Sequence, residues 1–453
     1  MRSTFDERAG ANFRAMLNDL KRTEVEAAGE LGVGADLILD IVAGRQAIPQ
    51  SLIERAVRVW PVNERDFHPL HDDVPDGIVV MRVRDSERSA RIIERGGGPY
   101  YEYRDTAMSR VSMIRPEWIR ILHGVDGVDA DDPTVRWNSG HFLYQFTYFI
   151  GDVNYYYEWD GRRYCCAMNS GDSVFGLPYA KHSFATREPS PPGLILALTY
   201  GGKLGGDGQH EIAVLGSESA AAFALDGTFA SLVAAAAENA GMPLHELAGA
   251  ASIENDHLAR LMQGHPPSPD EIGRLASALR IAPRELMPLE ADTDRGVVIV
   301  RHGDARTWMF PEDTRASYRV RRLAGSRATS FASALELDVL AAGEAAALTS
   351  SLYEYGYNHG QEPVALAWTS DGTPYETLLE PGDSFLVKPF VPHSFVRRAA
   401  GRDGARMLLL RVGGKVTGDA RLEASMIGAE GLRRLARDTA RWYPAQARSE
   451  ERR

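Results

Sequence analysis

Apolar residues recur at helical spacing in two separate segments of the chain. They fall at Ala28, Val33, Ile38, Ile41 and Val42 within residues 23–67, and at Ala248, Ile253, Leu258, Leu261 and Met262 within residues 243–287. The two segments align without a gap, 220 residues apart. In each, a glycine (Gly44, Gly264) is placed to end one helix and a proline (Pro49, Pro269) to begin the next. The pattern predicts the same small helical bundle twice.

Short β-branched and aromatic segments, broken by Gly, Pro, Asp and Asn, follow each predicted bundle. Such segments are typical of antiparallel strands. These stretches also match each other, because GDSVFGLPYAKHSF at 171–184 aligns with GDSFLVKPFVPHSF at 382–395. The shared motif resembles the second motif of cupins, which are double-sheet jelly rolls. It brings one histidine inward in each copy, His182 and His393.

The repeats predict a mixed α and all-β fold, a tandem repeat of a helix-turn-helix bundle followed by a cupin (jelly-roll) barrel. We expect a helix-turn-helix-like bundle at 1–70, a metal-binding cupin at 71–220, a second bundle at 225–292, a degenerate structural cupin at 293–437 and a frayed tail at 438–453. The second bundle, through HELAGAASI and IGRLASALRI, resembles repressor-type helix-turn-helix proteins more clearly than the first.

Composition favours a soluble, cytoplasmic protein. Of the 453 residues 44% are hydrophobic and 25% charged, and no apolar run approaches a membrane span. The N-terminal segment carries acidic residues and lacks the apolar centre of a secretory signal. The two cysteines, Cys165 and Cys166, are sequence neighbours, a spacing at which disulfide geometry is hard to satisfy. We assign them no function.

Charge argues against nucleic acid as a partner. The chain carries a net charge of −11, which repels a phosphate backbone. Within the first bundle, residues 23–67 have four arginines against eight acidic residues: Arg45, Arg55, Arg58 and Arg65 against Glu24, Glu26, Glu30, Asp36, Asp40, Glu54, Glu64 and Asp66. Because a DNA-recognition surface needs basic phosphate contacts, a cupin-containing transcriptional regulator is the weaker alternative.

The first predicted barrel carries a candidate metal site. His141 and Gln145 are four residues apart, and an even spacing places both side chains on one face of a strand. With His182 they would form a three-ligand site with open positions, as in non-haem Fe(II) oxygenases, where a carboxylate normally completes the set. A glutamine facing inward can instead hydrogen-bond a neighbouring strand. Asp172 and Glu158 are the rival third ligands, although Asp172 recurs as Asp383 in the same turn and is better explained as structural.

The second predicted barrel lacks a complete set of ligands. It contains His359 and His393, but the position four residues after His359 is Pro363, which cannot bind a metal. Glu362 could replace it only in a shifted register. We therefore expect this barrel to be a structural duplicate.

The order of modules, the length and the motif N-x-G-H followed by G-D-S-x8-H resemble the methylphosphonate synthase and hydroxyethylphosphonate dioxygenase family of non-haem iron oxygenases over nearly the whole chain. Hydroxypropylphosphonate epoxidase is a shorter relative. The dioxygenase takes its carboxylate ligand from the position of Gly176, which has no ligand to offer. Methylphosphonate synthase has H-x3-Q instead, and the run from His141 to Gln145 (HFLYQ) is similar to that pattern.

The resemblance implies Fe(II) held by His141, Gln145 and His182, with 2-hydroxyethylphosphonate and O2 as substrates. It also assigns four residues to substrate binding: Lys21, Arg95, Tyr103 and Asn138. Cations and neutral donors of this kind suit a phosphonate. The implied products are methylphosphonate and carbon dioxide or bicarbonate, with hydroxymethylphosphonate and formate as the alternative. A cupin oxygenase acting on another acid remains a third hypothesis, and assembly into a homo-oligomer is left open.

Overall fold

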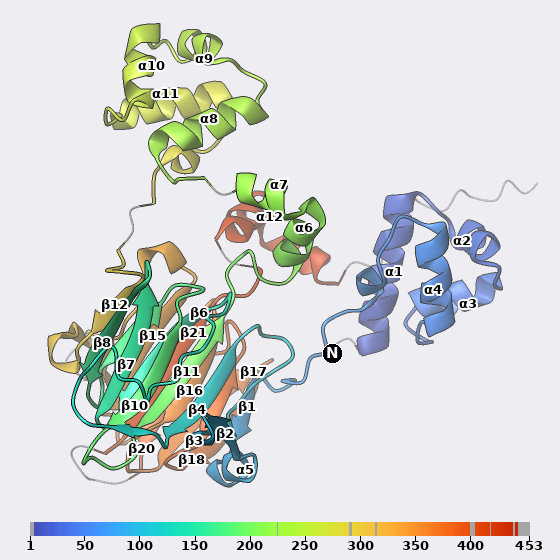
Figure 1. Ribbon diagram of the computed structural model, residues 1–453. Coiled ribbons are helices and arrows are strands. Elements are labelled where there is room, and N and C mark those ends of the chain that lie inside the picture. The colour runs from blue at the N-terminus through green and yellow to red at the C-terminus, as the bar shows by residue number, and fades with distance from the viewer. Residues whose placement is uncertain are drawn as a thin grey trace, which may run out of the picture.

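The computed structural model describes residues 4–223, 225–289, 292–312, 315–398, 404–416, 418–437 and 440–442. Two helical bundles stand apart from one strand-rich body, the first beside it and the second above it in the view of Figure 1. The predicted tail at 438–453 lies outside the described residues, apart from 440–442.

The first bundle contains α1 (Phe5–Leu20), α2 (Glu24–Leu31), α3 (Ala35–Val42), α4 (Gln50–Val59) and the short 3-10 helix η1 (Glu64–Phe67). A capping box between Thr23 and Glu26 begins α2 and satisfies backbone N–H groups that the helix leaves free. Phe13, Trp60 and Phe67 are buried at the centre of the bundle. Burial of these aromatic side chains stabilises helices that are too short to be stable alone.

The second bundle contains α8 (Phe229–Asn239), α9 (Leu244–Ala250), α10 (Asn255–Met262), α11 (Pro269–Leu279) and the 3-10 helix η2 (Pro283–Leu286). Its helices recur at the spacing that the sequence predicts. Helix α3 ends two residues before Gly44 and α10 two residues before Gly264, and both glycines have positive φ, which they adopt without a steric penalty. Ser268 and Glu271 form the capping box that begins α11.

The strand-rich body begins with β1 (Ile78–Met81) and helix α5 (Val83–Arg88). It continues with β2 (Arg91–Arg95), β3 (Gly98–Asp105), β4 (Arg115–Ile121), β5 (Gly124–Val125), β6 (Tyr144–Ile150), β7 (Val153–Trp159), β8 (Arg162–Met168), β9 (Ser173–Gly176), β10 (His182–Arg187) and β11 (Leu194–Tyr200). Helices α6 (Asp207–Leu215) and α7 (Ser217–Ala222) follow. Strands β12-β9-β6-β11-β4-β3-β2 form a seven-stranded sheet, and β5-β10-β7-β8 form a four-stranded sheet. We call these two sheets the first half.

The second half repeats this order. The chain continues with β12 (Val297–Val300), which belongs to a sheet of the first half. The following strands are β13 (Thr307–Phe310), β14 (Tyr318–Arg322), β15 (Ala332–Val339), β16 (Tyr353–Asn358), β17 (Val364–Ser370), β18 (Thr373–Leu379), β19 (Ser384–Val387), β20 (His393–Arg397) and β21 (Arg406–Val412), with 3-10 helices η3 (His302–Asp304) and η4 (Arg327–Thr329) and helix α12 (Asp419–Leu435). The sheets are β1-β19-β16-β21-β15-β14-β13 and β18-β17-β20.

The two halves exchange one strand. Strand β1 pairs with β19 of the second half, and β12 pairs with β9 of the first. Predicted boundaries at residues 71 and 293 therefore do not separate the sheets, because each predicted unit gives its first strand to the other. The sequence did not reveal this exchange of strands, since strand pairing over such separations leaves no local signal.

Aspartates of the two G-D-S turns hold the exchanged strands. Asp172 accepts a hydrogen bond from the Arg301 guanidinium at 2.8 Å and from the next backbone N–H, that of residue 302, at 2.9 Å. Asp383 accepts from Arg82 at 2.8 Å and from the N–H of residue 83 at 2.7 Å. The expectation that these aspartates are structural agrees with this arrangement.

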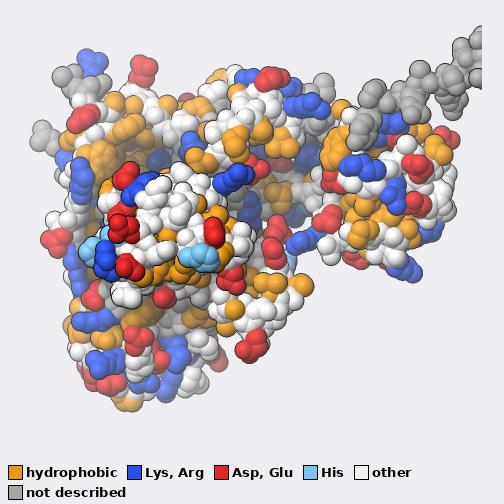
Figure 2. Space-filling view, turned by 90° about the horizontal axis from the view of Figure 1, so that it is seen from above, with side chains coloured by type: hydrophobic (Ala, Val, Ile, Leu, Met, Phe, Trp, Pro, Cys, Tyr) orange, Lys and Arg blue, Asp and Glu red, His pale blue; other side chains and the backbone are white. Residues whose placement is uncertain are grey.

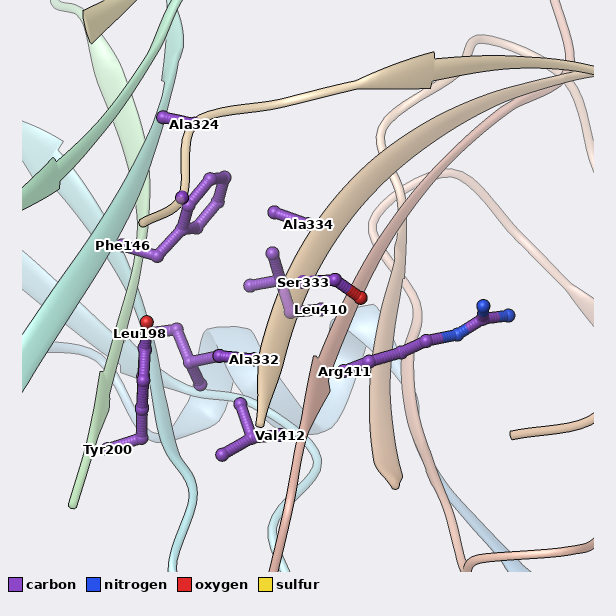
Figure 3. Close-up of a pocket in the computed structure, with 11 residues that line it drawn as sticks. Phe146, Leu198, Tyr200, Ala324, Ala332, Ser333, Ala334, Leu410, Arg411 and Val412 are labelled. Atoms are coloured by element: carbon purple, nitrogen blue, oxygen red, sulfur yellow. The ribbon is translucent and has the colours of Figure 1, made fainter. Parts of the chain in front are cut away.

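An apolar interface joins the large sheets of the two halves. Figure 3 shows Phe146, Leu198 and Tyr200 on one side of a small pocket, with Leu410 and Val412 on the other. These residues belong to one buried cluster that spans both sheets. Arg411, between Leu410 and Val412, points away from this interface, because successive side chains of a strand face opposite sides.

Among the described helices, none combines the length and the apolar character that crossing a bilayer requires.

Candidate metal site

The three predicted ligands lie together in the first half. His141 precedes β6, Gln145 lies within β6, and His182 is the first residue of β10. Nε2 of His141 is 3.0 Å from Oε1 of Gln145, and the two histidine rings are 5.3 Å apart between centroids. The two side chains therefore lie next to each other as predicted, although His141 lies outside the strand that carries Gln145.

Backbone and side-chain contacts orient each of these groups. Nδ1 of His141 lies 3.0 Å from the Leu143 carbonyl oxygen, and Nδ1 of His182 lies 2.9 Å from that of Ala180. The amide nitrogen of Gln145 donates to the Thr147 hydroxyl at 3.0 Å, which points Oε1 toward His141. Partners of this kind set the tautomer and direction of metal ligands.

The atoms around His141 are arranged in a way that suits the binding of a metal cation. Its two ring nitrogens face two oxygens, the Leu143 carbonyl and Oε1 of Gln145, each at 3.0 Å. A neutral imidazole has one N–H, so one nitrogen lone pair faces an oxygen lone pair. A metal ion bound by both atoms removes this repulsion. The separation also matches neighbouring ligands of an octahedral ion with bonds of about 2.1 Å.

His182 is prepared to act as a neutral ligand. Burial lowers the pKa of His182 to about 4, and the nearby charge of Arg95 acts in the same direction. The side-chain amide of Asn138 donates to Nε2 of His182 at 3.0 Å, and its Oδ1 accepts the backbone N–H of His182 at 2.8 Å. Nε2 is therefore the unprotonated nitrogen, the form that binds metals.

The rival third ligands have other partners. Glu158 pairs with Lys181 at 2.7 Å, and Asp172 pairs with Arg301. Across the described ranges, no group of three or more His, Cys, Asp and Glu side chains could hold a metal ion. A three-ligand site built on His141 and His182 therefore depends on a residue outside these four types, and Gln145 is in place.

Gly176 lies beside Gln145. The two residues are register partners on β9 and β6, and Gly176 is buried. A Cβ built on Gly176 would make ordinary contacts with the Tyr155 hydroxyl at 3.8 Å and the Gln145 carbonyl oxygen at 4.0 Å. A glycine at this position offers no carboxylate ligand.

Two of the predicted substrate-binding residues share this neighbourhood. Arg95, at the end of β2, donates to the Arg136 carbonyl oxygen at 3.0 Å and lies 5.0 Å from the Tyr101 ring centroid. Its charge acts on both His182 and Tyr103. Burial raises the pKa of Tyr103 to about 12, so its phenol is a neutral donor. Asn138 thus contacts His182 directly, and Arg95 lies near enough for its charge to lower the pKa of His182.

Lys21 is not brought to this site within the chain. It follows α1, where its ammonium donates to the Asn18 carbonyl oxygen at 3.1 Å and lies 4.1 Å from the Trp442 ring centroid. The bundle that carries Lys21 stands beside the strand-rich body (Figure 1). The predicted contact between Lys21 and the substrate is therefore not made inside one chain of this structure.

Two residues near the site were not predicted. Thr147, which orients the Gln145 amide, follows Gln145 by two positions, so strand periodicity could have found it. Tyr155 comes from β7 of the four-stranded sheet, and its hydroxyl lies near Gly176 of the seven-stranded sheet. No local pattern marks that approach.

Register in the second half corrects the predicted equivalence of His359. Glu354 faces Val387 as Gln145 faces Gly176, so Glu354 is the counterpart of Gln145. The Ser350 carbonyl accepts the N–H of residue 390 at 2.7 Å, as the His141 carbonyl accepts that of residue 179 at 2.7 Å. Ser350 therefore replaces His141. His359 follows the end of β16, and matching it to His141, with Pro363 or Glu362 as the next ligand position, was wrong.

A buried ion-pair cluster fills the site of the second half. Nε2 of His393 lies 2.8 Å from Oε1 of Glu354, and Nε of Arg411 lies 2.6 Å from Oε2. Glu354 and His393 are each 1% exposed. Both cationic groups are thus protein side chains, and both oxygens of the carboxylate are engaged.

Comparison with known proteins places the fold and then the family. No family model matches the chain. The structure superposes with a TM-score of 0.93 on the hydroxyethylphosphonate dioxygenase of Streptomyces albus, solved with 2-hydroxyethylphosphonate and Fe(II) bound, at 41% identity over 97% of this chain and 99% of that one. A variant of another hydroxyethylphosphonate dioxygenase shares the fold at a TM-score of 0.76 and 18% identity, over 94% of this chain and 99% of its own. Fold and site thus define a protein with the architecture of the phosphonate dioxygenases.

The methylphosphonate synthase of Nitrosopumilus maritimus is 41% identical over 445 residues, which is 96% of this chain and 95% of the relative. The chain belongs to the methylphosphonate synthase family.

Proposed function

We propose that this protein is an iron(II)- and O2-dependent oxygenase that cleaves the C–C bond of 2-hydroxyethylphosphonate to methylphosphonate and carbon dioxide or bicarbonate. Family membership and the substrate and Fe(II) bound by the Streptomyces albus neighbour support the reaction class. The observation that carries the proposal is the close approach of three potential ligands: Nε2 of His141 lies 3.0 Å from Oε1 of Gln145, and the ring of His141 lies 5.3 Å from that of His182.

His141, Gln145 and His182 would hold the iron. When bound, the ion supplies the redox chemistry and a template for substrate and O2. The chain's own contribution is orientation. The Leu143 and Ala180 carbonyl groups hold the two imidazoles, and Thr147 holds the amide. Fixed ligands reduce the reorganisation that the reaction requires.

Arg95, Tyr103 and Asn138 would bind the phosphonate. A phosphonate carries close to two negative charges, and a guanidinium with neutral donors satisfies its oxygens. The raised pKa of Tyr103 keeps its phenol protonated at neutral pH, so that it donates rather than repels. Lys21 would join them only by reaching the site of another copy in a homo-oligomer.

The third ligand favours methylphosphonate as the product. An amide at Gln145, with Gly176 in place of a carboxylate, leaves the site one unit more positive than two histidines with a carboxylate. We infer that this difference alters how the phosphonate-bearing fragment is captured. Relatedness alone does not choose between the two outcomes, because a synthase and a dioxygenase are each 41% identical to this chain.

The test is turnover followed by phosphorus NMR. Protein loaded with Fe(II) under anaerobic conditions receives 2-hydroxyethylphosphonate and then O2, with Gln145→Ala as a control that lacks the amide. Methylphosphonate as the main product of the unaltered protein supports the proposal. Hydroxymethylphosphonate would overturn the product assignment, and an iron-loaded protein that consumes no phosphonate would overturn the substrate class.

For the architecture, we propose that both halves are cupins and both bundles are helix-turn-helix-like, with the second cupin structural. The repeated helices and the repeated sheet order support this proposal. Acidic and basic side chains are interspersed over the first bundle on the face seen in Figure 2. That mixture disfavours the alternative of a transcriptional regulator, because phosphate contacts need grouped cations.

A further inference from the structure

We infer that Thr147 is a positioning residue of the metal site, whose hydroxyl accepts a hydrogen bond from the Gln145 amide and so holds the amide oxygen toward the metal. The inference rests on the proposed function and deepens it, because it makes the third ligand a pair of residues rather than the amide alone. Three features of the structure carry it: the asymmetry of an amide, the apolar neighbours of Thr147 and the arrangement at the same position in the second half.

A glutamine side chain can bind a metal in only one orientation. Its Oε1 has lone pairs for a cation, whereas its Nε2 carries two N–H donors. In this structure Oε1 of Gln145 lies 3.0 Å from Nε2 of His141, and Nε2 of Gln145 donates to the Thr147 hydroxyl at 3.0 Å. Thr147 therefore supplies the acceptor that the amide nitrogen needs when the amide oxygen faces the metal.

Apolar side chains flank Thr147 on both neighbouring strands. Its register partners are Val174 on β9 and Ala197 on β11, and neither side chain can accept a hydrogen bond. All three residues are buried. A buried N–H that loses its acceptor carries the full cost of desolvation. Without a hydroxyl at position 147, binding of a metal through Oε1 of Gln145 would have to overcome that cost.

The second half holds the corresponding side chain in another way. Its counterpart of the glutamine is Glu354, and the oxygen turned away from the histidine, Oε2, accepts from Nε of Arg411 at 2.6 Å. Arg411 is the register partner of Glu354 on β21. The position of Thr147 is occupied by Gly356, where a Cβ would overlap the ring of Phe385. A cation thus holds the outer atom of the carboxylate, and a hydroxyl holds that of the amide.

The test measures the affinity of the full-length protein for Fe(II) by chelator competition, without oxygen and without substrate. Thr147→Val removes the hydroxyl and keeps the branched side chain that suits a strand. We expect it to weaken iron binding about 10-fold or more, because loss of a residue that supports a ligand costs 10- to 100-fold. Thr147→Ser keeps the hydroxyl and should restore most of the affinity.

Thr199→Val is the matched control. Thr199 is the register partner of Gln145 on β11, and its hydroxyl donates to the Arg115 carbonyl oxygen at 3.3 Å. Loss of this hydroxyl from the same sheet should leave iron affinity unchanged.

A double-mutant cycle supplies a readout that a purely structural role of Thr147 would not change. In the Gln145→Ala background, Thr147→Val should cost no further iron affinity, because Thr147 acts through the amide.

The outcomes separate this inference from the proposed function. Unchanged iron affinity in Thr147→Val, an equal loss in Thr147→Ser or in Thr199→Val, or the same loss with and without the Gln145 amide would each overturn the role of Thr147 while the function stands. Turnover of 2-hydroxyethylphosphonate by the unaltered protein tests the function separately. An unaltered protein that binds no iron would overturn both, and one that binds iron without converting the phosphonate would overturn the function alone.

Discussion

The two halves of the strand-rich body place different chemistry on the same framework. His182 and His393 each begin a strand, with Nδ1 at 2.9 Å and 3.1 Å from the carbonyl oxygen two residues earlier. Two residues further along, the backbone N–H groups of Phe184 and Phe395 donate to tyrosine hydroxyls at 2.9 Å and 3.0 Å. The backbone and its aromatic supports are therefore shared by both halves.

The halves differ in the side chains that surround the histidine of the shared cupin motif, His182 in the first half and His393 in the second. In the first half this histidine, His182, contacts the Asn138 amide, and in the second half His393 contacts the Glu354 carboxylate. The replacements are Asn138 by Leu348, His141 by Ser350, Gln145 by Glu354, Tyr155 by Leu366 and Gly176 by Val387. The first half leaves nitrogen and oxygen atoms available to bind a metal cation. In the second half, the cation beside the carboxylate is the Arg411 side chain. The same barrel thus has two ways to satisfy buried polar groups.

The largest effect is expected from copying the second half into the first. His141→Ser should lower iron affinity by more than about 100-fold, since even loss of a residue that supports a ligand costs 10- to 100-fold, and should abolish turnover. Ser350→Ala should change neither. Bound iron and phosphorus NMR measure both effects. Unchanged iron content in His141→Ser would remove His141 from the metal site.

Breaking the ion-pair cluster of the second half should affect stability alone. In Glu354→Gln, the cations of Arg411 and His393 lose a buried carboxylate that is 1% exposed. Removing one partner of a buried pair costs about 3–5 kcal/mol. Urea unfolding measures the loss, and iron binding by the first half serves as the internal control. A loss of iron affinity would show that the two sites are coupled.

The same cluster should make the free energy of unfolding depend on pH, with a loss at acidic pH through Glu354 and a loss at higher pH through His393. Although burial alone would raise it, His393 and Arg411 lower the pKa of Glu354 to about 2. Its stabilisation is present above about pH 4.3, the usual value for glutamate, and is lost as the pH falls toward 2. Burial alone would lower the pKa of His393, but Glu354 raises it. That stabilisation is full below about pH 6.5 and is lost as the pH rises through the higher folded value.

Urea unfolding between pH 3 and pH 9 would measure this dependence. Glu354→Gln removes the carboxylate on which both shifts depend, so its stability should vary less with pH at both ends. A variant with the same pH profile as the unaltered protein would contradict the assignment of these shifts to the cluster.

Because each half gives one strand to the other, the aspartates that hold these two strands should contribute similar amounts to stability. Asp172→Asn and Asp383→Asn each weaken contacts to an arginine and to a backbone N–H that directly follow an exchanged strand. We expect a loss of about 1–3 kcal/mol for each, of similar size, in urea unfolding. A loss confined to one variant would show that a single strand, rather than the exchange, holds the halves together.

The smallest effect is expected for Lys21→Ala. Its contact with the Trp442 ring at 4.1 Å is worth about 0.5–1 kcal/mol at an exposed site. If Lys21 acts only within its own chain, substrate affinity will not change. A weaker affinity, measured by calorimetry on the iron-loaded protein, would show that Lys21 reaches a phosphonate in a second copy, as the family resemblance implies.

Short-range features of the fold were predictable. The spacing of apolar residues, with Gly44 and Pro49 at the joints, predicted helices that the structure shows at matching positions in both bundles. Within the site, the four-residue step from His141 to Gln145 and the motif before His182 brought the three side chains together. Such features depend on residues within one or two turns of each other, where periodicity carries the information.

Long-range features were not predictable. The predicted match of His359 to His141 failed because register between β16 and its neighbours, not spacing from a histidine, decides which residue faces the site. The exchange of β1 and β12 also depends on pairing between segments far apart, as between Ile78 and Val387.

By itself, the sequence determined the repeated modules, the placement of His141, Gln145 and His182, and the absence of a carboxylate at Gly176, because each depends on local periodicity or on residue identity. Only the tertiary structure decided that Lys21 stays in its bundle, that the halves share strands, and that Glu354 and Arg411 close the second site. The last two outcomes depend on strand register, which brings together side chains that no local pattern connects.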